Sequence, residues 1–355
     1  MKIAFFAAIR LNSNAIPGLE KWIINVSEQL LNSGHEVSIY GVTSVPRVYI
    51  YKTYGNPLKN PKVRYYEILT EWGKFTPFRI VDLQNIDMDV DLIYVSAGYY
   101  TYLKQILSLG AKTIFGFHNP ELQYPRNHRQ RAILNRLMPK FDGVHVLSRN
   151  QINLFHTKHP VLFLENTSFN RVNLPVTKYK RFTAIYFSRW EYSKGIKTVA
   201  YLSEKIPDDM DLIICGFGSV DIRKIIKQKD NVKVMESVRE ETLFEILQSA
   251  HVTIFPSYSE SSLSLALNES LAHATPLIYR SIPQNHPLEL ISNTLNKVAN
   301  SDDEFFNSLM ELKSIFQDDP NAYLQKCCEL INLVEPLEDY INGIEKFFHQ
   351  VIQEA

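Results

Sequence analysis

The chain alternates short runs of β-branched and aromatic residues with longer stretches of helical periodicity, and this pattern occurs twice. Such alternation is typical of β-α-β units, in which helices connect the strands of a parallel sheet. Strand candidates in the first half are residues 2–7, 36–40, 92–96, 113–117, 143–147 and 161–164. Strand candidates in the second half are residues 183–187, 212–215, 232–235, 252–255 and 276–278. The sequence therefore predicts two doubly wound α/β domains.

The apolar periodicity lapses at residues 171–181, which we interpret as an interdomain linker. This gives an N-terminal domain at 1–170 and a C-terminal domain at 182–335. A helical pattern at 336–355 is expected to pack back towards the N-terminal domain. The total of 355 residues fits two domains of ordinary size.

The formal net charge is zero, which argues against a dedicated nucleic-acid binder. That zero is a sum of opposite halves. Residues 1–170 carry 19 Lys and Arg against 12 Asp and Glu, a net charge of +7, and residues 171–355 carry −7. A nucleic-acid binder that uses the basic half remains an alternative, although we do not expect nucleic acid as a partner.

Three cysteines, two of them adjacent, give neither an even disulfide framework nor a zinc spacing, so a reducing, cytoplasmic location is expected. No apolar run approaches the roughly 18 residues of a membrane-spanning helix. Residues 123–140 hold five Lys and Arg without an acid, interleaved with apolar residues. This segment either contacts an anionic membrane surface or a phosphate-bearing acceptor, or is a solvated helix.

Ligands of doubly wound sheets bind at the carboxyl ends of the strands. Arg189 and Lys194 follow the strand candidate at 183–187, on a loop that leads into a helix. Two cations in this position can hold a diphosphate, since an Arg fork binds phosphate oxygens in pairs and Lys supplies a point charge. The alternative is a pair of solvated surface cations. His118 likewise follows a strand, and a lone histidine in such a position is more often a structural residue.

Residues 255–278 read as strand, polar loop, helix and strand, and the helix begins in a Ser-rich turn. The backbone N–H groups of such a turn are open to a phosphate or sugar oxygen. Glu269 lies about one helical turn after Leu265. A carboxylate so placed can accept hydrogen bonds from two ribose hydroxyls, and the alternative is an ordinary exposed helix Glu.

Together these motifs resemble the retaining glycosyltransferases of family 4. The resemblance runs from Pro-Gly-Leu-Glu at 17–20 and Gly-His-Glu-Val at 34–37, through Arg189 and Lys194, to Thr275-Pro276. It implies the GT-B fold, in which two Rossmann-like domains face each other across a cleft. It also implies transfer of a sugar from a UDP- or GDP-linked donor to a hydroxyl of a glycan, glycolipid or glycoprotein, with retention of anomeric configuration and without a metal or other cofactor.

The resemblance also assigns roles to residues. Arg189 and Lys194 would bind the donor diphosphate, Glu269 the ribose, and Glu260 and His118 the transferred sugar. Further donor contacts would come from Gly18, Gly216, Val238, Ser261, Ser264 and Leu265.

The chain departs from the family pattern at several of these positions. Glu260 and Glu269 enclose eight residues instead of seven, so either the loop has one extra residue or Ser261 replaces the first Glu. Pro17 and Ser188 stand where the family has glycine. A degenerate protein that binds sugar nucleotides without turnover is therefore the alternative function.

Two Asp-x-Asp pairs, at residues 87–89 and 209–211, precede their strand candidates. That position is the amino end of the sheet, away from the ligand side, so we interpret them as solvated strand entrances and expect no metal site. Gly216-Phe-Gly218 lacks the third glycine of a dinucleotide fingerprint. The sequence thus favours a metal-independent transferase over a dehydrogenase.

Overall fold

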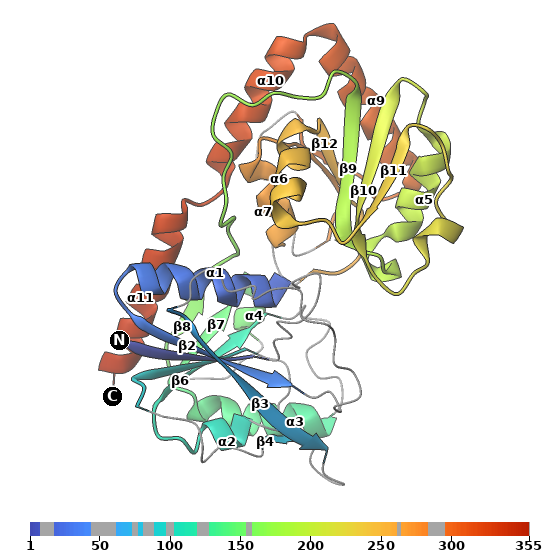
Figure 1. The fold of residues 1–355 in the computed structure, drawn as a ribbon. Helices are drawn as coiled ribbons and strands as arrows, with labels where there is room; N and C mark the ends of the chain where they lie inside the picture. Colours follow the sequence, from blue (N-terminus) through green and yellow to red (C-terminus); the bar gives the residue numbers. More distant parts are fainter. Residues whose placement is uncertain are drawn as a thin grey trace. The chain divides into compact units, whose positions relative to one another are not determined.

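A computed structural model describes residues 1–7, 18–43, 62–72, 77–80, 89–96, 103–118, 128–153, 158–260, 264–282 and 295–354. The chain divides into two compact units. The first unit comprises Met1–Glu165 together with Glu338–Ala355, and the second comprises Asn166–Leu337. Each unit contains a sheet with helices on both faces (Figure 1).

The first unit is built on an eight-stranded sheet with the order β4-β3-β2-β1-β5-β6-β7-β8. Its strands are β1 (Lys2–Ala7), β2 (Glu36–Thr43), β3 (Arg64–Trp72), β4 (Pro77–Ile80), β5 (Leu92–Ser96), β6 (Lys112–Phe117), β7 (Gly143–Val146) and β8 (Val161–Phe163). All neighbouring strands pair in parallel except β3 and β4. Every residue of β5 and β7 is buried, as expected for parallel strands with helices on both faces.

Helices pack on both faces of the first sheet. The helical elements of this unit are α1 (Gly18–Asn32), α2 (Leu103–Ile106), α3 (His128–Leu137), η3 (Met138–Lys140), α4 (Arg149–Ile152) and α11 (Leu337–Gln353). Apolar residues of α2 and α3 join one core cluster with β5, β6 and β7. The C-terminal helix α11 lies beside α1 (Figure 1), and the indole N–H of Trp22 donates to the Tyr340 hydroxyl at 2.6 Å.

The second unit is built on six parallel strands with the order β11-β10-β9-β12-β13-β14. They are β9 (Phe182–Arg189), β10 (Met210–Phe217), β11 (Val232–Glu236), β12 (Val252–Phe255), β13 (Leu277–Tyr279) and β14 (Lys297–Val298). The helical elements are η4 (Tyr192–Lys194), α5 (Ile196–Lys205), η5 (Ile222–Lys224), α6 (Glu240–Ser249), α7 (Leu265–Ala272), α9 (Asp302–Asp318), α10 (Pro320–Glu329) and η7 (Leu330–Leu333). Residues of α5, α9 and α10 join the strands in the largest core cluster, whereas α6 and α7 contribute to separate clusters.

These two sheets confirm the predicted fold class of two doubly wound α/β domains. The sequence pattern did not reveal β3, β4 or β14, and the antiparallel β4 lies at the edge of an otherwise parallel sheet. No helix in the part of the chain that the structure describes is long and apolar enough to cross a membrane.

Residues 171–181, interpreted from the sequence as a linker, pack onto the second unit. The Val172 amide donates to the Ala272 carbonyl at 3.0 Å, and Val176 is buried in the largest core cluster. The Lys178 ammonium donates to the Ala274 carbonyl at 2.7 Å, and burial lowers the pKa of Lys178 to about 8. The loss of periodicity thus marks an extended segment held by these contacts, and the change of unit falls at 165–166.

Candidate functional site

The second unit gathers most of the predicted site residues at the carboxyl ends of β9, β10, β11 and β12. These four strands are neighbours in the sheet, and their register pairs Phe217 with Arg189 and Gly216 with both Ser188 and Glu236. Residues that are far apart in the sequence therefore end at one edge. This is the edge where doubly wound sheets bind ligands.

Lys194 and Glu260 form a buried ion pair at this edge. Lys194 ends η4 and Glu260 follows β12, and the distance from Lys194 Nζ to Glu260 Oε1 is 2.6 Å. Their side chains are only 14% and 8% exposed. Removing one member of such a buried pair leaves an uncompensated charge, so each side chain depends on the other.

The loops that carry this ion pair contact each other closely. A Cβ atom on Gly195, whose φ is +74°, would lie 2.3 Å from the Pro256 carbonyl oxygen. The Tyr258 amide donates to the Ser193 carbonyl at 2.9 Å. On the β9 side, the Tyr186 hydroxyl lies 3.1 Å from the Arg189 carbonyl and 3.3 Å from that of Lys194, and burial raises the pKa of Tyr186. These contacts hold the Lys194 turn on the sheet.

Arg189 is the last residue of β9 and its side chain is half exposed. Its Nη1 atom donates to Glu191 Oε1 at 3.0 Å. A guanidinium has five N–H donors, so this contact leaves others to bind an anion. Arg189, at the end of β9, and Lys194, at the end of η4, therefore supply two cations between β9 and α5.

A sharp turn at the end of β10 brings the next loop onto the Arg189 segment. Gly216 has φ of +151°, and a Cβ there would lie 2.0 Å from the Ser188 carbonyl oxygen, so no other residue fits. The Ser237 amide donates to the Gly216 carbonyl at 3.0 Å. Val238 follows directly and is half-buried against the cluster that includes α6.

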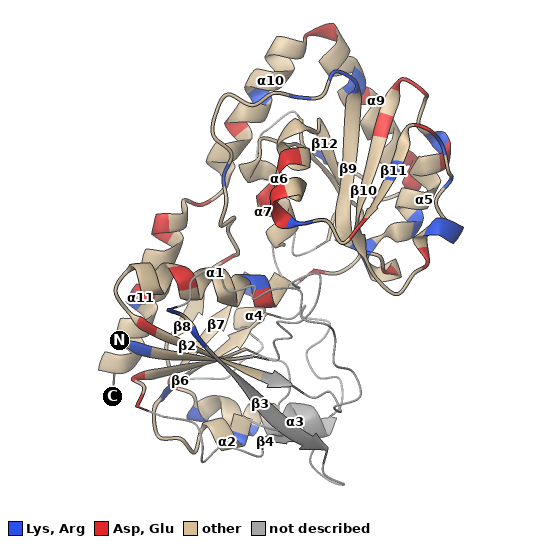
Figure 2. Cartoon of the chain, in the orientation of Figure 1, with Lys and Arg blue, Asp and Glu red and all other residues tan. Residues whose placement is uncertain are grey.

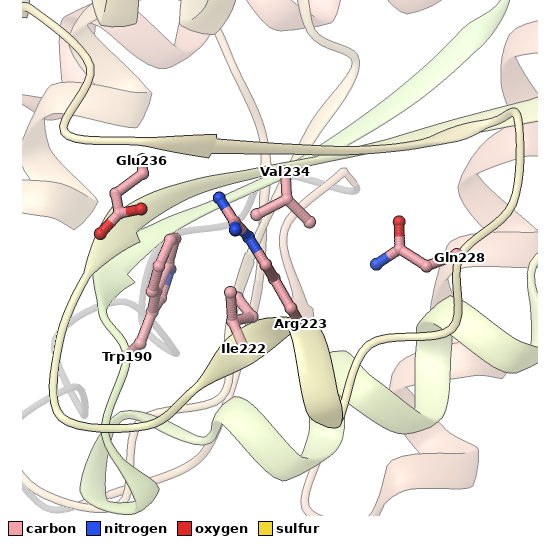
Figure 3. Close-up of a pocket in the computed structure, with 6 residues that line it drawn as sticks. All are labelled: Trp190, Ile222, Arg223, Gln228, Val234 and Glu236. Carbon is pink, nitrogen blue, oxygen red and sulfur yellow. The ribbon is translucent and has the colours of Figure 1, made fainter.

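A cavity of about 380 Å³ lies beside this turn, at the edge of the sheet formed by β11. Its lining residues are Trp190, Ile222, Arg223, Gln228, Val234 and Glu236. Figure 3 shows the Arg223 side chain extending between Trp190 and Val234, with Glu236 and Gln228 on opposite sides of it. The cavity thus offers both a cation and an anion.

Helix α7 carries the other predicted donor contacts. Ser264 caps the helix, because its side chain accepts from the Leu267 amide, and Leu265 is the first helical residue. Glu269 is buried on the same helix, whereas the sequence alternative was an exposed Glu. Ser261 lies outside the described residues, so its relation to Glu260 has no structural description.

The first unit places the two remaining predicted residues after two strands of its sheet. Gly18 is the exposed first residue of α1, which follows β1. His118 directly follows β6, and its Nε2 atom lies 2.7 Å from the Tyr94 hydroxyl. The same hydroxyl lies 2.7 Å from His145 Nδ1. Burial lowers the pKa of His118 well below its usual value and lowers that of His145 to about 4.

Sequence reasoning did not find Tyr94 and His145. They lie within buried strands, where a Tyr and a His read as core residues. Only the order β5-β6-β7 brings them to either side of the strand that leads to His118.

The basic segment at 123–140 is described from residue 128 onward. Leu134, Leu137 and Met138 are buried in the core cluster of the first unit, while Arg136 and Lys140 are exposed. These three apolar side chains are thus used within the fold. What it can offer a membrane or an anionic acceptor is charge.

The Asp-x-Asp pair at 209–211 lies at the amino end of β10, as predicted. Asp209 pairs with Lys313 at 2.5 Å and Asp211 pairs with Arg181 at 3.3 Å. Among the described residues, no group of three or more His, Cys, Asp or Glu could hold a metal ion.

The charge asymmetry persists with the observed boundaries of the units. The first unit has 20 Lys and Arg against 16 Asp and Glu, and the second has 18 against 22. Helix α6 of the second unit begins with Glu240 and Glu241, and its ribbon is red, the colour of Asp and Glu, in Figure 2. An anion that binds this unit must therefore be held by local cations.

Two protein families match the chain, one in each half. Residues 16–162 match the family described as Glycosyltransferase Family 4, and residues 181–332 match that described as Glycosyl transferases group 1. The chain belongs to the family 4 glycosyltransferases of the GT-B type. Together the two matches cover most of this glycosyltransferase, and no curated protein matches it significantly.

Solved structures share the fold of this glycosyltransferase over its whole length. A TarM variant from S. aureus, in complex with fondaparinux, α-GlcNAc-glycerol and UDP, has a TM-score of 0.75 at 12% identity and covers 98% of this chain and 99% of its own. Sucrose-phosphate synthase from Thermosynechococcus elongatus has a TM-score of 0.70 at 15% identity, with all of both chains covered. Anabaena HepE in complex with UDP and glucose has a TM-score of 0.69 at 14% identity, covering 98% of this chain and 99% of its own.

Proposed function

We propose that this glycosyltransferase transfers a sugar from a UDP- or GDP-linked donor to a hydroxyl of a glycan, glycolipid or glycoprotein, with retention of anomeric configuration. The observation that carries the proposal is the joint position of Arg189, Lys194 and Glu260 at the carboxyl ends of β9 and β12. Structures of similar fold have been solved with UDP or UDP-glucose, which supports a nucleotide sugar as donor.

The donor diphosphate binds Arg189 and Lys194. Arg189 supplies paired N–H donors and Lys194 a point charge, and both stabilise the negative charge that develops on the departing diphosphate. Glu260, 2.6 Å from Lys194 Nζ, contacts the sugar, and Glu269 on α7 accepts hydrogen bonds from the ribose. Gly216, Val238, Ser261, Ser264 and Leu265 complete the donor contacts, and no metal takes part.

The chemical step breaks the bond between the anomeric carbon and the diphosphate oxygen. The acceptor hydroxyl forms the new bond on the same face, and its proton passes to the departing phosphate oxygen. The leaving group is then its own base. A double displacement through a carboxylate is the second choice, because no carboxylate of the sequence stands out as a nucleophile.

The acceptor is assigned to the first unit, which also supplies Gly18 as a donor contact and His118 as a contact of the transferred sugar. The basic excess of this unit suits an anionic acceptor. We extend the proposal to a cytoplasmic enzyme whose exposed Arg136 and Lys140 contact an anionic membrane surface by charge alone.

A sugar-nucleotide-binding protein without turnover is the second candidate. The eight residues between Glu260 and Glu269 favour it, since the family pattern has seven. It predicts the same binding cations and a bound sugar that is never transferred or hydrolysed.

The experiment is a thermal-shift screen with UDP-, GDP- and ADP-sugars, followed by measurement of nucleotide release. A ligand that binds only the folded state raises its apparent stability. We expect one donor class to stabilise the protein and to release nucleotide, with a product of the same anomeric configuration as the donor by NMR. Binding without release would support the second candidate, and no binding by any donor would refute both.

A further inference from the structure

The Tyr94 hydroxyl in the first unit has two histidine partners and a single proton. It lies 2.7 Å from His118 Nε2 and 2.7 Å from His145 Nδ1. A phenol can donate one hydrogen bond and accept another. One histidine must therefore accept from Tyr94 and the other must donate to it.

The Leu164 carbonyl decides which histidine accepts. His145 Nε2 lies 3.3 Å from the Leu164 carbonyl oxygen. A carbonyl oxygen only accepts, so His145 Nε2 carries a proton. Burial lowers the pKa of His145 to about 4, so the ring is neutral at pH 7 and its Nδ1 has no proton. His145 Nδ1 therefore accepts from the Tyr94 hydroxyl.

The direction of the second hydrogen bond follows from the first. The Tyr94 hydroxyl donates its one proton to His145, so its oxygen accepts a hydrogen bond from His118 Nε2–H. A neutral His118 then has an unprotonated Nδ1. Burial and the neighbouring His145 lower the pKa of His118 well below its usual value, which is consistent with a neutral ring.

Close packing holds these groups in place. A Cβ atom on Gly116 would lie 2.1 Å from the Tyr94 hydroxyl oxygen, so only glycine on β6 admits the phenol. The Trp22 ring packs against all three side chains, with its centroid 4.5 Å from that of His118, 5.4 Å from Tyr94 and 5.7 Å from His145. No described residue pairs with His118 Nδ1.

From this geometry we infer that Leu164, His145 and Tyr94 form a hydrogen-bond relay that fixes His118 as the Nε2–H tautomer, so that His118 meets its ligand through Nδ1 as a hydrogen-bond acceptor. Tyr94 and His145 are positioning residues, because they act through His118. The inference about the ligand rests on the proposed function: the transferred sugar must offer a hydroxyl that donates to Nδ1. His118 is then neither a proton donor nor an electrostatic clamp for the diphosphate.

NMR of the ligand-free full chain tests the relay without reference to activity. In protein labelled with ¹⁵N-histidine at neutral pH, long-range ¹H–¹⁵N spectra distinguish a protonated from an unprotonated ring nitrogen. We expect an unprotonated Nδ1 in both His118 and His145, each assigned by loss of its signals in the corresponding Gln variant. A protonated Nδ1 on either ring, or averaging between tautomers, would overturn the relay.

Substitutions test its positioning role. Tyr94→Phe and His145→Leu should each release the His118 tautomer, whereas His145→Asn, whose amide oxygen lies near the position of Nδ1, should keep it. The matched control is Tyr323→Phe in the second unit, which loses a buried hydroxyl bonded to the His251 carbonyl at 2.8 Å. If Tyr94→Phe fails to fold, the pair His145→Leu and His145→Asn still decides.

Turnover separates the relay from the proposed function. The donor is whichever UDP-, GDP- or ADP-sugar the wild type uses. Tyr94→Phe and His145→Leu should each lower kcat/KM about tenfold, which corresponds to the loss of one hydrogen bond. The double variant should have the same kcat/KM as either single variant, because both substitutions break the same relay. Equal losses in Tyr323→Phe, or in His145→Asn, would refute the positioning role. Absence of wild-type turnover with every donor would refute the proposed function, while the spectra still decide the relay.

Discussion

Gly195 lies where the two loops that carry the Lys194–Glu260 ion pair contact each other, and Gly195→Ala should separate these loops. The new Cβ would lie 2.3 Å from the Pro256 carbonyl oxygen, whereas ordinary contacts are about 3.5 Å. The loops must therefore move apart by about 1 Å. The left-handed backbone, with φ of +74°, adds about 1–2 kcal/mol of strain for any residue with a side chain.

The consequence for activity follows from the ion-pair geometry. Lys194 Nζ and Glu260 Oε1 are 2.6 Å apart, and a further 1 Å takes them beyond hydrogen-bond distance. A misplacement of this size in a catalytic site costs about 100-fold in rate. We expect Gly195→Ala to lower kcat/KM for the donor about 100-fold, measured as initial rates of nucleotide release.

Gly34→Ala is the matched control. Gly34 also has positive φ, at +89°, but a Cβ atom added there would meet nothing within 4 Å. This variant should show only the backbone cost in stability and wild-type kcat/KM. If Gly195→Ala keeps wild-type kcat/KM, contact between the two loops does not position the ion pair, and the reasoning is wrong.

Two further predictions concern the stability of the units. Burial lowers the pKa of His145 to about 4 and that of His251 to about 3, so between these values and about 6.5 the unfolded state binds more protons than the folded state. The free energy of unfolding should therefore decrease as the pH falls from 7, by about 2 kcal/mol per histidine at pH 5. Urea unfolding that does not change between pH 7 and 5 would contradict the burial of both rings. Tyr340→Phe should cost about 1–3 kcal/mol, because it leaves the buried indole N–H of Trp22 without its acceptor on α11. Its control in urea unfolding is Tyr192→Phe at a side chain that is 58% exposed, and equal effects would refute the role of this hydrogen bond.

The sequence predicts strands best where they are buried on both faces. The strands at Lys2–Ala7, Leu92–Ser96 and Val252–Phe255 begin and end where the apolar runs do. Strand β3 was missed because Arg64–Trp72 mixes charged with aromatic residues, and such a run does not stand out from its neighbours. Its position near the sheet edge, paired with the antiparallel β4, explains why a continuous apolar run is not required.

The sequence likewise predicts some residues of the candidate site and not others. Arg189, Lys194 and Glu269 can be predicted from the sequence, because a charged residue after a strand, or on a Ser-capped helix, by itself indicates ligand binding. Tyr94 and His145 give no such signal in the sequence. Their hydrogen bond depends on the order of the strands and on the absence of a side chain at Gly116. Likewise, the burial of the Lys194–Glu260 pair depends on how two loops contact each other, and the distance between these loops cannot be predicted from a single sequence.

Calorimetric titration of the nucleotide sugar into Lys194→Ala and Lys197→Ala tests the central claim most directly. Lys197 lies three residues away and is exposed over the Tyr192 ring, so it matches the charge lost without touching the Glu260 pair. The donor from the thermal-shift screen should bind wild type and Lys197→Ala equally and Lys194→Ala at least tenfold more weakly, with nucleotide release lost. Equal binding and release by both variants would show that Lys194 does not hold the donor diphosphate.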